Sequence, residues 1–191
     1  MKSKVIAAFF LSMMISSFAS ADRIGICAGC HGLDGNITDP LYPKIAGQQL
    51  NYMIAELKAY RSDARQTPDS GYMGLLKGYT DEEIRQISEY FAAQTPKPGI
   101  VEADEKVIAL GKSIYEKGIP AKNVSACAEC HGDKAEGRSK TPRLSGQNTS
   151  YFVKQMIWYK TGERTGKMMP DLVGDMTEEE IEAVGLYLES I

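Results

Sequence analysis

The sequence predicts an all-α protein built from two tandem copies of one small domain. A short motif with two cysteines and a histidine occurs at residues 27–32 and again at residues 127–132. Stretches that follow the first motif recur after the second in the same order. Apolar residues recur at three- and four-residue spacing, which is typical of helices, and no stretch shows the alternating pattern of a strand. Together these observations indicate a duplicated helical domain.

Residues 1–21 have the features of a secretory signal peptide. Lys2 and Lys4 supply a positively charged start, an apolar stretch covers 5–18, and Ala-Ser-Ala at 19–21 fits a small-residue cleavage site. The alternative is an uncleaved membrane anchor, but serines interrupt the apolar stretch, which is shorter than the ~20 residues that a membrane span needs. Cysteine motifs of this kind suit an oxidising compartment. We therefore expect export to a bacterial periplasm.

The duplication holds in register downstream of the motifs. Residues 43–48, Pro-Lys-Ile-Ala-Gly-Gln, match residues 142–147, Pro-Arg-Leu-Ser-Gly-Gln. The equivalent pairs that follow are Tyr52 with Tyr151, Tyr60 with Tyr159, and Arg65 with Arg164. Between the copies, residues 94–99 contain two prolines and a glycine, which stop a helix and favour a stiff connector. These features predict domains at residues 22–98 and 99–191, after a signal peptide at 1–21.

Within each copy, a central helix and a final helix are expected. Residues 48–61 carry an apolar stripe. Thr80 and Thr177 each precede three acidic residues, and this pattern predicts capping boxes at the start of the final helices. The expected buried residues of those helices are Ile84, Ile87, Phe91, Ile181, Val184 and Leu188. A leading helix at 105–116 is expected in the second copy only, because residues 22–26 are too few for a packed helix.

The repeated motif uses all four cysteines and both histidines of the chain: Cys27, Cys30, His31, Cys127, Cys130 and His131. Cys-x-x-Cys-His is the attachment signature of c-type haem. On one helical turn, two sulfurs three residues apart lie on the same face and reach the two vinyl groups of a porphyrin. The adjacent histidine then ligates the iron. The sequence therefore predicts two covalently bound haem c groups.

Three other uses of the cysteines explain less. A thioredoxin-like Cys-x-x-Cys needs a βαβ context and gives the histidines no role. The two cysteine pairs are about a hundred residues apart, far beyond the spacing of about 15–20 residues in a typical zinc site. Two structural disulfides also leave the histidines unused.

The sixth iron ligand is expected to be methionine, because no further histidine exists. In the first copy Met73 lies in the loop before the final helix, whereas Met53 lies on an apolar stripe and is expected in the core. In the second copy the same loop offers Met168 and Met169. Two equivalent arginines, Arg65 and Arg164, are either partners of haem propionates or solvated surface residues.

With these motifs the sequence resembles the class I cytochromes c, and in particular the dihaem cytochrome c4 family, over nearly all of residues 22–191. In that family the proline of a Pro-x-Leu-x-Gly segment turns its carbonyl to the haem-ligating histidine, and Pro43 and Pro142 match this proline. The family's ligand loop often reads Met-Pro, which favours Met169 over Met168, while Met73 is followed by glycine. The resemblance implies two tandem class I cytochrome c domains whose iron ligands are His31, Met73, His131 and Met169.

The resemblance also implies a function. It indicates a periplasmic electron carrier, and not an enzyme, that passes single electrons to a membrane terminal oxidase. The alternative is the dihaem subunit of a flavocytochrome c sulfide dehydrogenase, whose ligand loop is similar to residues 73–79 and whose electron donor is a flavoprotein. A haem enzyme such as a dihaem peroxidase or a thiosulfate-oxidising cytochrome needs an acid–base group beside an open iron site, and no distal histidine remains.

Composition narrows the partners further. The chain has 22 basic and 25 acidic residues, a formal charge of -3, and no basic patch or basic helix stands out. This excludes a typical nucleic-acid-binding protein. The expected partners are redox proteins, namely a membrane oxidase or reductase or a flavoprotein, and no small-molecule substrate is expected.

Overall fold

The computed structural model describes residues 22–191, and the expected signal peptide at residues 1–21 lies outside the described residues. Residues 22–31 are helical. The elements that follow are α2 (Leu50–Arg61), η1 (Ser70–Gly78), α3 (Asp81–Ala92), α4 (Glu105–Lys117), η2 (Pro120–Lys122), α5 (Ala128–His131), α6 (Thr149–Thr161), α7 (Met169–Val173) and α8 (Glu178–Glu189).

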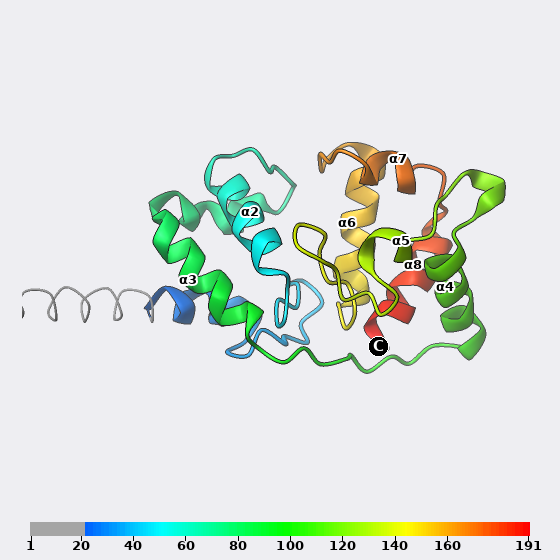
Figure 1. Ribbon diagram of the computed structural model, residues 1–191, viewed down its shortest axis with the longest axis horizontal. Coiled ribbons are helices and arrows are strands. Elements are labelled where there is room, and N and C mark those ends of the chain that lie inside the picture. Colours follow the sequence, from blue (N-terminus) through cyan, green and yellow to red (C-terminus); the bar gives the residue numbers. More distant parts are fainter. Residues whose placement is uncertain (1–21) are drawn as a thin grey trace, which may run out of the picture.

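The predicted all-α fold class is confirmed. Over the described range the chain has no strand, and only two isolated bridges join Ile119 to Val124 and Arg138 to Thr141. One group of helices contains α2 and α3 and the other contains α4 to α8, and an extended segment runs along one side of the molecule to join them (Figure 1). None of the helices within 22–191 has both the length and the apolar character needed to cross a membrane.

The two final helices begin as the sequence predicts. The Thr80 hydroxyl accepts the backbone N–H of Glu83, and the Glu83 carboxylate accepts the backbone N–H of Thr80. Thr177 and Glu180 form the same reciprocal pair at the start of α8. Because these capping boxes satisfy backbone donors that a helix start leaves unpaired, they fix where α3 and α8 begin.

Each group of helices has its own apolar core. The core of the first group contains the buried residues Met53, Leu76, Tyr79, Ile84, Ile87 and Phe91. The core of the second group contains Ile114, Tyr115, Val124, Ala135, Phe152, Met156, Val173, Met176, Ile181, Val184, Tyr187 and Leu188. All six residues expected to be buried on the final helices are 2 % exposed or less, so that prediction is confirmed.

The leading helix of the second group, α4, packs closely on α8. Gly111 allows this contact, because a Cβ at this position would lie 1.9 Å from the carbonyl oxygen of Ala183. Ile114 and Tyr115, one turn further on, are buried against the same core. The glycine therefore lets the two backbones approach to a distance that no other residue permits.

Within residues 22–191 the first group has no separate leading helix, but the expectation that residues 22–26 do not pack is wrong. They belong to the helical segment 22–31, which runs through the cysteine motif. Ile24 packs against the core, and Arg23 lies over the Tyr79 ring at 4.3 Å and pairs with Glu83 at 3.1 Å. The motif itself is helical and supplies the length that the preceding residues lack.

The close contact of α4 with α8 predicts the effect of Gly111→Ala. The added methyl group has to push the helices apart, and overpacking of this kind costs about 1–3 kcal/mol. Denaturant unfolding followed by the fluorescence of Trp158, the single tryptophan, should show a lower midpoint for the second group of helices.

Gly29→Ala is the matched control, because it lies in a helical segment with nothing within 4 Å of its added Cβ. The control should leave stability unchanged or raise it by about 0.5–1 kcal/mol. Equal midpoints for Gly111→Ala and the unchanged protein would contradict the close approach of α4 and α8.

Candidate haem sites

The first cysteine motif lies at the end of the helical segment 22–31. Cys27 is half-buried and packs against the core of the first group, whereas Cys30 is exposed. The His31 ring lies with its Nδ1 atom 3.0 Å from the carbonyl oxygen of Pro43. The hydrogen bond that the family resemblance implies for this proline is therefore present.

The second motif has the same geometry on a shorter helix. Cys127 packs against the core of the second group, directly before α5. His131, the last residue of α5, is 8 % exposed, and its Nδ1 lies 3.0 Å from the carbonyl oxygen of Pro142. The Tyr115 hydroxyl on α4 donates to the carbonyl oxygen of Gly132 at 2.6 Å, which ties the leading helix to the motif.

The proline carbonyls decide the tautomer of both imidazoles. A carbonyl oxygen only accepts hydrogen bonds, so Nδ1 of His31 and His131 carries the proton and Nε2 keeps its lone pair. Burial lowers the pKa of each imidazole, and the bond to the proline carbonyl opposes this with a smaller effect. Both rings are therefore neutral near pH 7 and present Nε2 as a metal ligand.

The first cysteine of each motif is a buried thiol. Burial raises the pKa of Cys27 to about 11 and that of Cys127 to about 11. A redox dithiol needs a thiolate near neutral pH, which these environments disfavour. The four cysteines form no disulfide.

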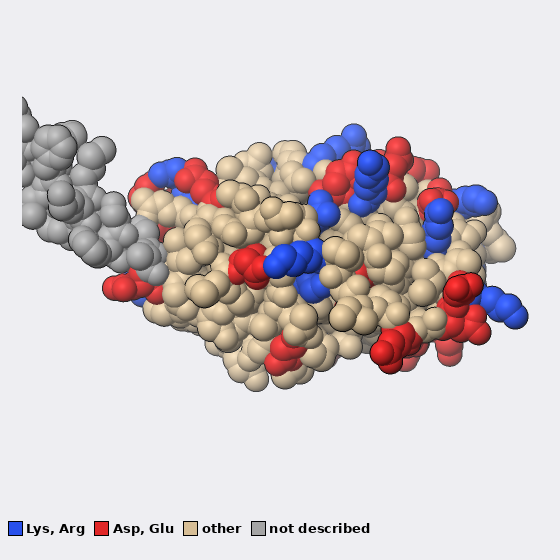
Figure 2. Space-filling view, turned by 90° about the horizontal axis from the view of Figure 1, so that it is seen from below, with Lys and Arg blue, Asp and Glu red and all other residues tan. Residues whose placement is uncertain are grey.

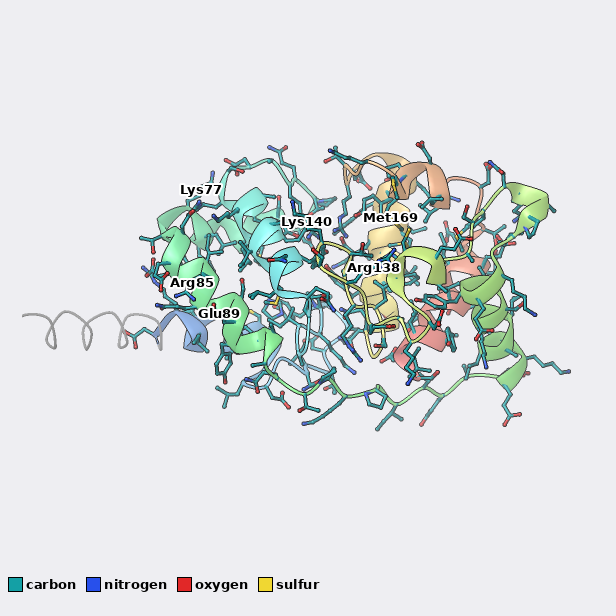
Figure 3. The ribbon with its side chains drawn as sticks, viewed as in Figure 1. Lys77, Arg85, Glu89, Arg138, Lys140 and Met169 are labelled. Carbon is teal, nitrogen blue, oxygen red and sulfur yellow. The ribbon has the colours of Figure 1, made fainter. Side chains whose placement is uncertain are left out.

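In each group of helices, one predicted methionine ligand packs against the same core as a motif cysteine. Met73, in η1, is half-buried on the cluster that also contacts Cys27. Met169, the first residue of α7, is half-buried on the cluster that also contacts Cys127, beside α6 (Figure 3). Met168, in contrast, is 56 % exposed, and Met53 is buried in the core as expected.

Arg164 is buried and Arg65 is half-buried where the two groups of helices meet, so the alternative that they are solvated surface residues is wrong. Arg65 pairs with Glu56 and donates to Oε1 of Gln155 at 3.1 Å. Arg164, 7 % exposed, donates to the same oxygen at 2.6 Å and lies 3.5 Å from Glu56. Two guanidinium groups thus share one carboxylate, and Nε of Arg65 is buried without a partner among the described residues.

Further polar side chains at this interface were not singled out from the sequence. Gln48, Gln147 and Asn148 are 8 %, 8 % and 3 % exposed, and each makes hydrogen bonds to backbone atoms of the other group of helices. The signal for the glutamines was present, since they end the two repeated segments at 43–48 and 142–147. Their partners are about a hundred residues away in sequence and could not be identified from it.

These residues fit two c-type haems. In each group the first motif cysteine packs against an apolar core, a neutral imidazole has a free Nε2, and a methionine borders the same core. The excess positive charge of the arginine pair and the unpartnered Nε of Arg65 suit a carboxylate such as a haem propionate. The fold and the sites together define a tandem pair of c-type cytochrome domains.

Comparison with known proteins agrees with this class. Residues 25–94 match the family "Cytochrome c", and residues 107–188 match the family "Cytochrome C oxidase, cbb3-type, subunit III". A cytochrome c4 of Thiocapsa roseopersicina is 32 % identical over 87 % of this chain and 88 % of its own length. The solved cytochrome c4 of Acidithiobacillus ferrooxidans superimposes with a TM-score of 0.82 and 31 % identity, over 87 % of this chain and 99 % of the other.

The chain belongs to the dihaem cytochrome c4 family. It binds two haem c groups covalently, through Cys27 and Cys30 and through Cys127 and Cys130, and it is an electron carrier. It is also similar to a thiosulfate dehydrogenase electron acceptor of Thiomonas intermedia, 29 % identical over 96 % of this chain and 86 % of that protein.

Removing one cysteine pair should remove one covalent haem. Acid–acetone extraction of the unchanged protein should leave the colour with the polypeptide, and mass analysis should show two haem additions. The double variant Cys127→Ala, Cys130→Ala should show one. Colour that moves from the unchanged protein into the organic phase would contradict covalent attachment.

Proposed function

We propose that the protein carries single electrons in the periplasm and delivers them to a membrane terminal oxidase. In this proposal His31 and Met73 ligate the first haem iron, and His131 and Met169 ligate the second. The observation that carries it is the pairing, on each apolar core, of a motif cysteine with one half-buried methionine of the short helix before the last helix.

The haem supplies the one-electron Fe(II)/Fe(III) chemistry. The protein's own residues hold it, exclude water from it and set its potential. A thioether ligand favours the ferrous state, which suits a carrier that works at the oxidising end of a respiratory chain. The buried, neutral imidazoles supply the opposite ligand without needing to lose a proton.

A carrier role is favoured over an enzymatic one. Catalysis on a small molecule needs an open iron site with an acid–base group beside it. The chain has two histidines, and both belong to the motifs. We therefore assign the redox partners to proteins and not to a small substrate.

The proposed compartment rests on residues 1–21, which have the charged start, apolar stretch and cleavage pattern of an export signal. We propose that cleavage leaves Asp22 as the first residue. On the face seen in Figure 2 basic and acidic side chains are interspersed, without a continuous basic area, which agrees with protein partners in place of nucleic acid.

A second candidate role is acceptance of electrons from a thiosulfate dehydrogenase. It is favoured by the similarity to the thiosulfate dehydrogenase electron acceptor over 96 % of this chain. The role of cytochrome subunit for a flavoprotein sulfide dehydrogenase remains the third, supported by the resemblance of residues 73–79 to that ligand loop. All three roles use the same two haems and differ in the redox partners.

Replacement of each of the two adjacent methionines by alanine tests the ligand assignment. Met169→Ala should convert one haem to a high-spin or water-ligated form and lower its potential, because the thioether no longer favours Fe(II). The neighbouring Met168→Ala is the matched control and should leave the absorbance band of Met–Fe(III) bonding intact. The reverse result would mean that Met168 is the ligand.

Mixing with purified partners tests the direction of electron flow. The ferrous protein should be reoxidised by a terminal oxidase in the presence of oxygen, and cyanide should block this. Ferric protein should in parallel be offered to a thiosulfate dehydrogenase with thiosulfate, and to a flavoprotein with sulfide. Failure of the oxidase reaction would refute the leading role, and rapid reduction by one dehydrogenase would identify the donor.

A further inference from the structure

A glutamine of the second domain holds the peptide that binds the histidine of the first haem motif. The Lys44 backbone N–H donates to Oε1 of Gln147 at 2.8 Å, and Nε2 of Gln147 donates to the Lys44 carbonyl oxygen at 2.9 Å. Both residues are buried, at 9 % and 8 % exposed. Lys44 directly follows Pro43, whose carbonyl accepts the bond from Nδ1 of His31.

A glutamine of the first domain makes the equivalent contact with the second domain. The Arg143 backbone N–H donates to Oε1 of Gln48 at 2.7 Å, and Nε2 of Gln48 donates to the Arg143 carbonyl oxygen at 3.0 Å. Arg143 follows Pro142, the acceptor for His131. Because each domain uses the same two positions to bind the other, the contact has the reciprocity of a two-fold interface.

The chemistry of this arrangement lies in a single amide group. The Pro43 carbonyl and the Lys44 N–H are the two ends of one peptide bond, so the imidazole and the glutamine bind opposite ends of the same dipole. An amide whose N–H is hydrogen-bonded becomes a stronger acceptor at its oxygen. A stronger acceptor on Nδ1–H in turn makes the imidazole a more basic ligand, which stabilises the ferric state.

We propose that Gln147 tunes the potential of the first haem and Gln48 that of the second. Each glutamine acts across the domain interface through the peptide whose carbonyl oxygen binds the histidine of the other domain. They are positioning residues that act through the imidazole and touch no iron. The inference rests on the proposed ligation by His31 and His131. It follows that the potential of each haem depends on whether the other domain is docked.

Other interface side chains show what simple docking contacts look like. Asn148 donates from Nδ2 to the carbonyl oxygens of Ile37, Asp39 and Tyr42, and Gln49 donates from Nε2 to that of Glu136. None of these carbonyls belongs to a peptide bonded to a proximal histidine. They hold the domains together without a hydrogen bond to either peptide that binds a motif histidine.

The test is a crossed pattern of potentials in the full-length dihaem protein. Gln147→Leu should raise the potential of the first haem and leave the second unchanged, and Gln48→Leu should do the opposite. Cooperative strengthening of one hydrogen bond suggests a change of about twofold to fivefold in the ferric/ferrous equilibrium. For one electron this corresponds to about 18–41 mV, at 59 mV per tenfold.

Gln147→Glu gives the complementary result and serves if the leucine variant does not fold. Its carboxylate keeps an acceptor for the Lys44 N–H and strengthens that bond, so the potential of the first haem should fall and fall more than that of the second. The NMR shift of the Nδ1 proton of His31 should move in opposite directions in the leucine and glutamate variants. A purely structural role does not predict such a pair of opposite shifts.

Asn148→Leu and Gln49→Leu are the matched controls and should leave both potentials in place. Equal shifts of both haems, a shift of the haem in the variant's own domain, or shifts equal to those of the controls would overturn the inference. The absorbance band of Met–Fe(III) bonding is recorded for every sample. Its absence from the unchanged protein would refute the proposed methionine ligation, whereas its presence without crossed shifts refutes only the role of the glutamines.

Discussion

The hydrogen bond from each motif histidine to a proline carbonyl is the contact on which the rest of the structure depends. It selects the tautomer that leaves Nε2 free for a metal, and it requires the chain to turn back soon after the motif. In the first domain the backbone N–H groups of Ile45 and Ala46 both donate to Gly35, which has a φ of 71° and closes this turn. In the second domain Leu144 and Ser145 donate to Ala135 in the same way.

The same returning segment also forms the centre of the domain interface. Its proline binds the imidazole, the next residue pairs with a glutamine of the other domain, and the glycine before its own glutamine donates to the end of the final helix. Buried amides of this kind stabilise little unless every donor and acceptor is paired, and here the glutamine amides pair at both ends. The geometry of these paired hydrogen bonds therefore specifies the interface, and the same peptides bind the motif histidines.

The two domains are related but not equivalent. A separate helix, α4, covers the second domain and reaches the motif through the Tyr115 hydroxyl. In the first domain one helical segment does both tasks, and large apolar side chains near its motif, Ile26 and Leu33, are 49 % and 73 % exposed. The difference leaves the first motif more open to solvent, although both motifs keep the same bond from histidine to proline carbonyl.

The sequence by itself determined the features that depend on local spacing. The motifs, the duplication, the capping boxes at Thr80 and Thr177 and the buried faces of the final helices all follow from residues within a turn or two of one another. The short helix at 22–31 was missed because its length includes the motif itself. Only the tertiary structure decided that Arg164 is buried and Arg65 half-buried, that Met169 packs against the core while Met168 is exposed, and that Gln48 and Gln147 bind the peptides that accept from the motif histidines. The arginine and glutamine contacts join segments about a hundred residues apart, and no local pattern records which distant atom a side chain will meet.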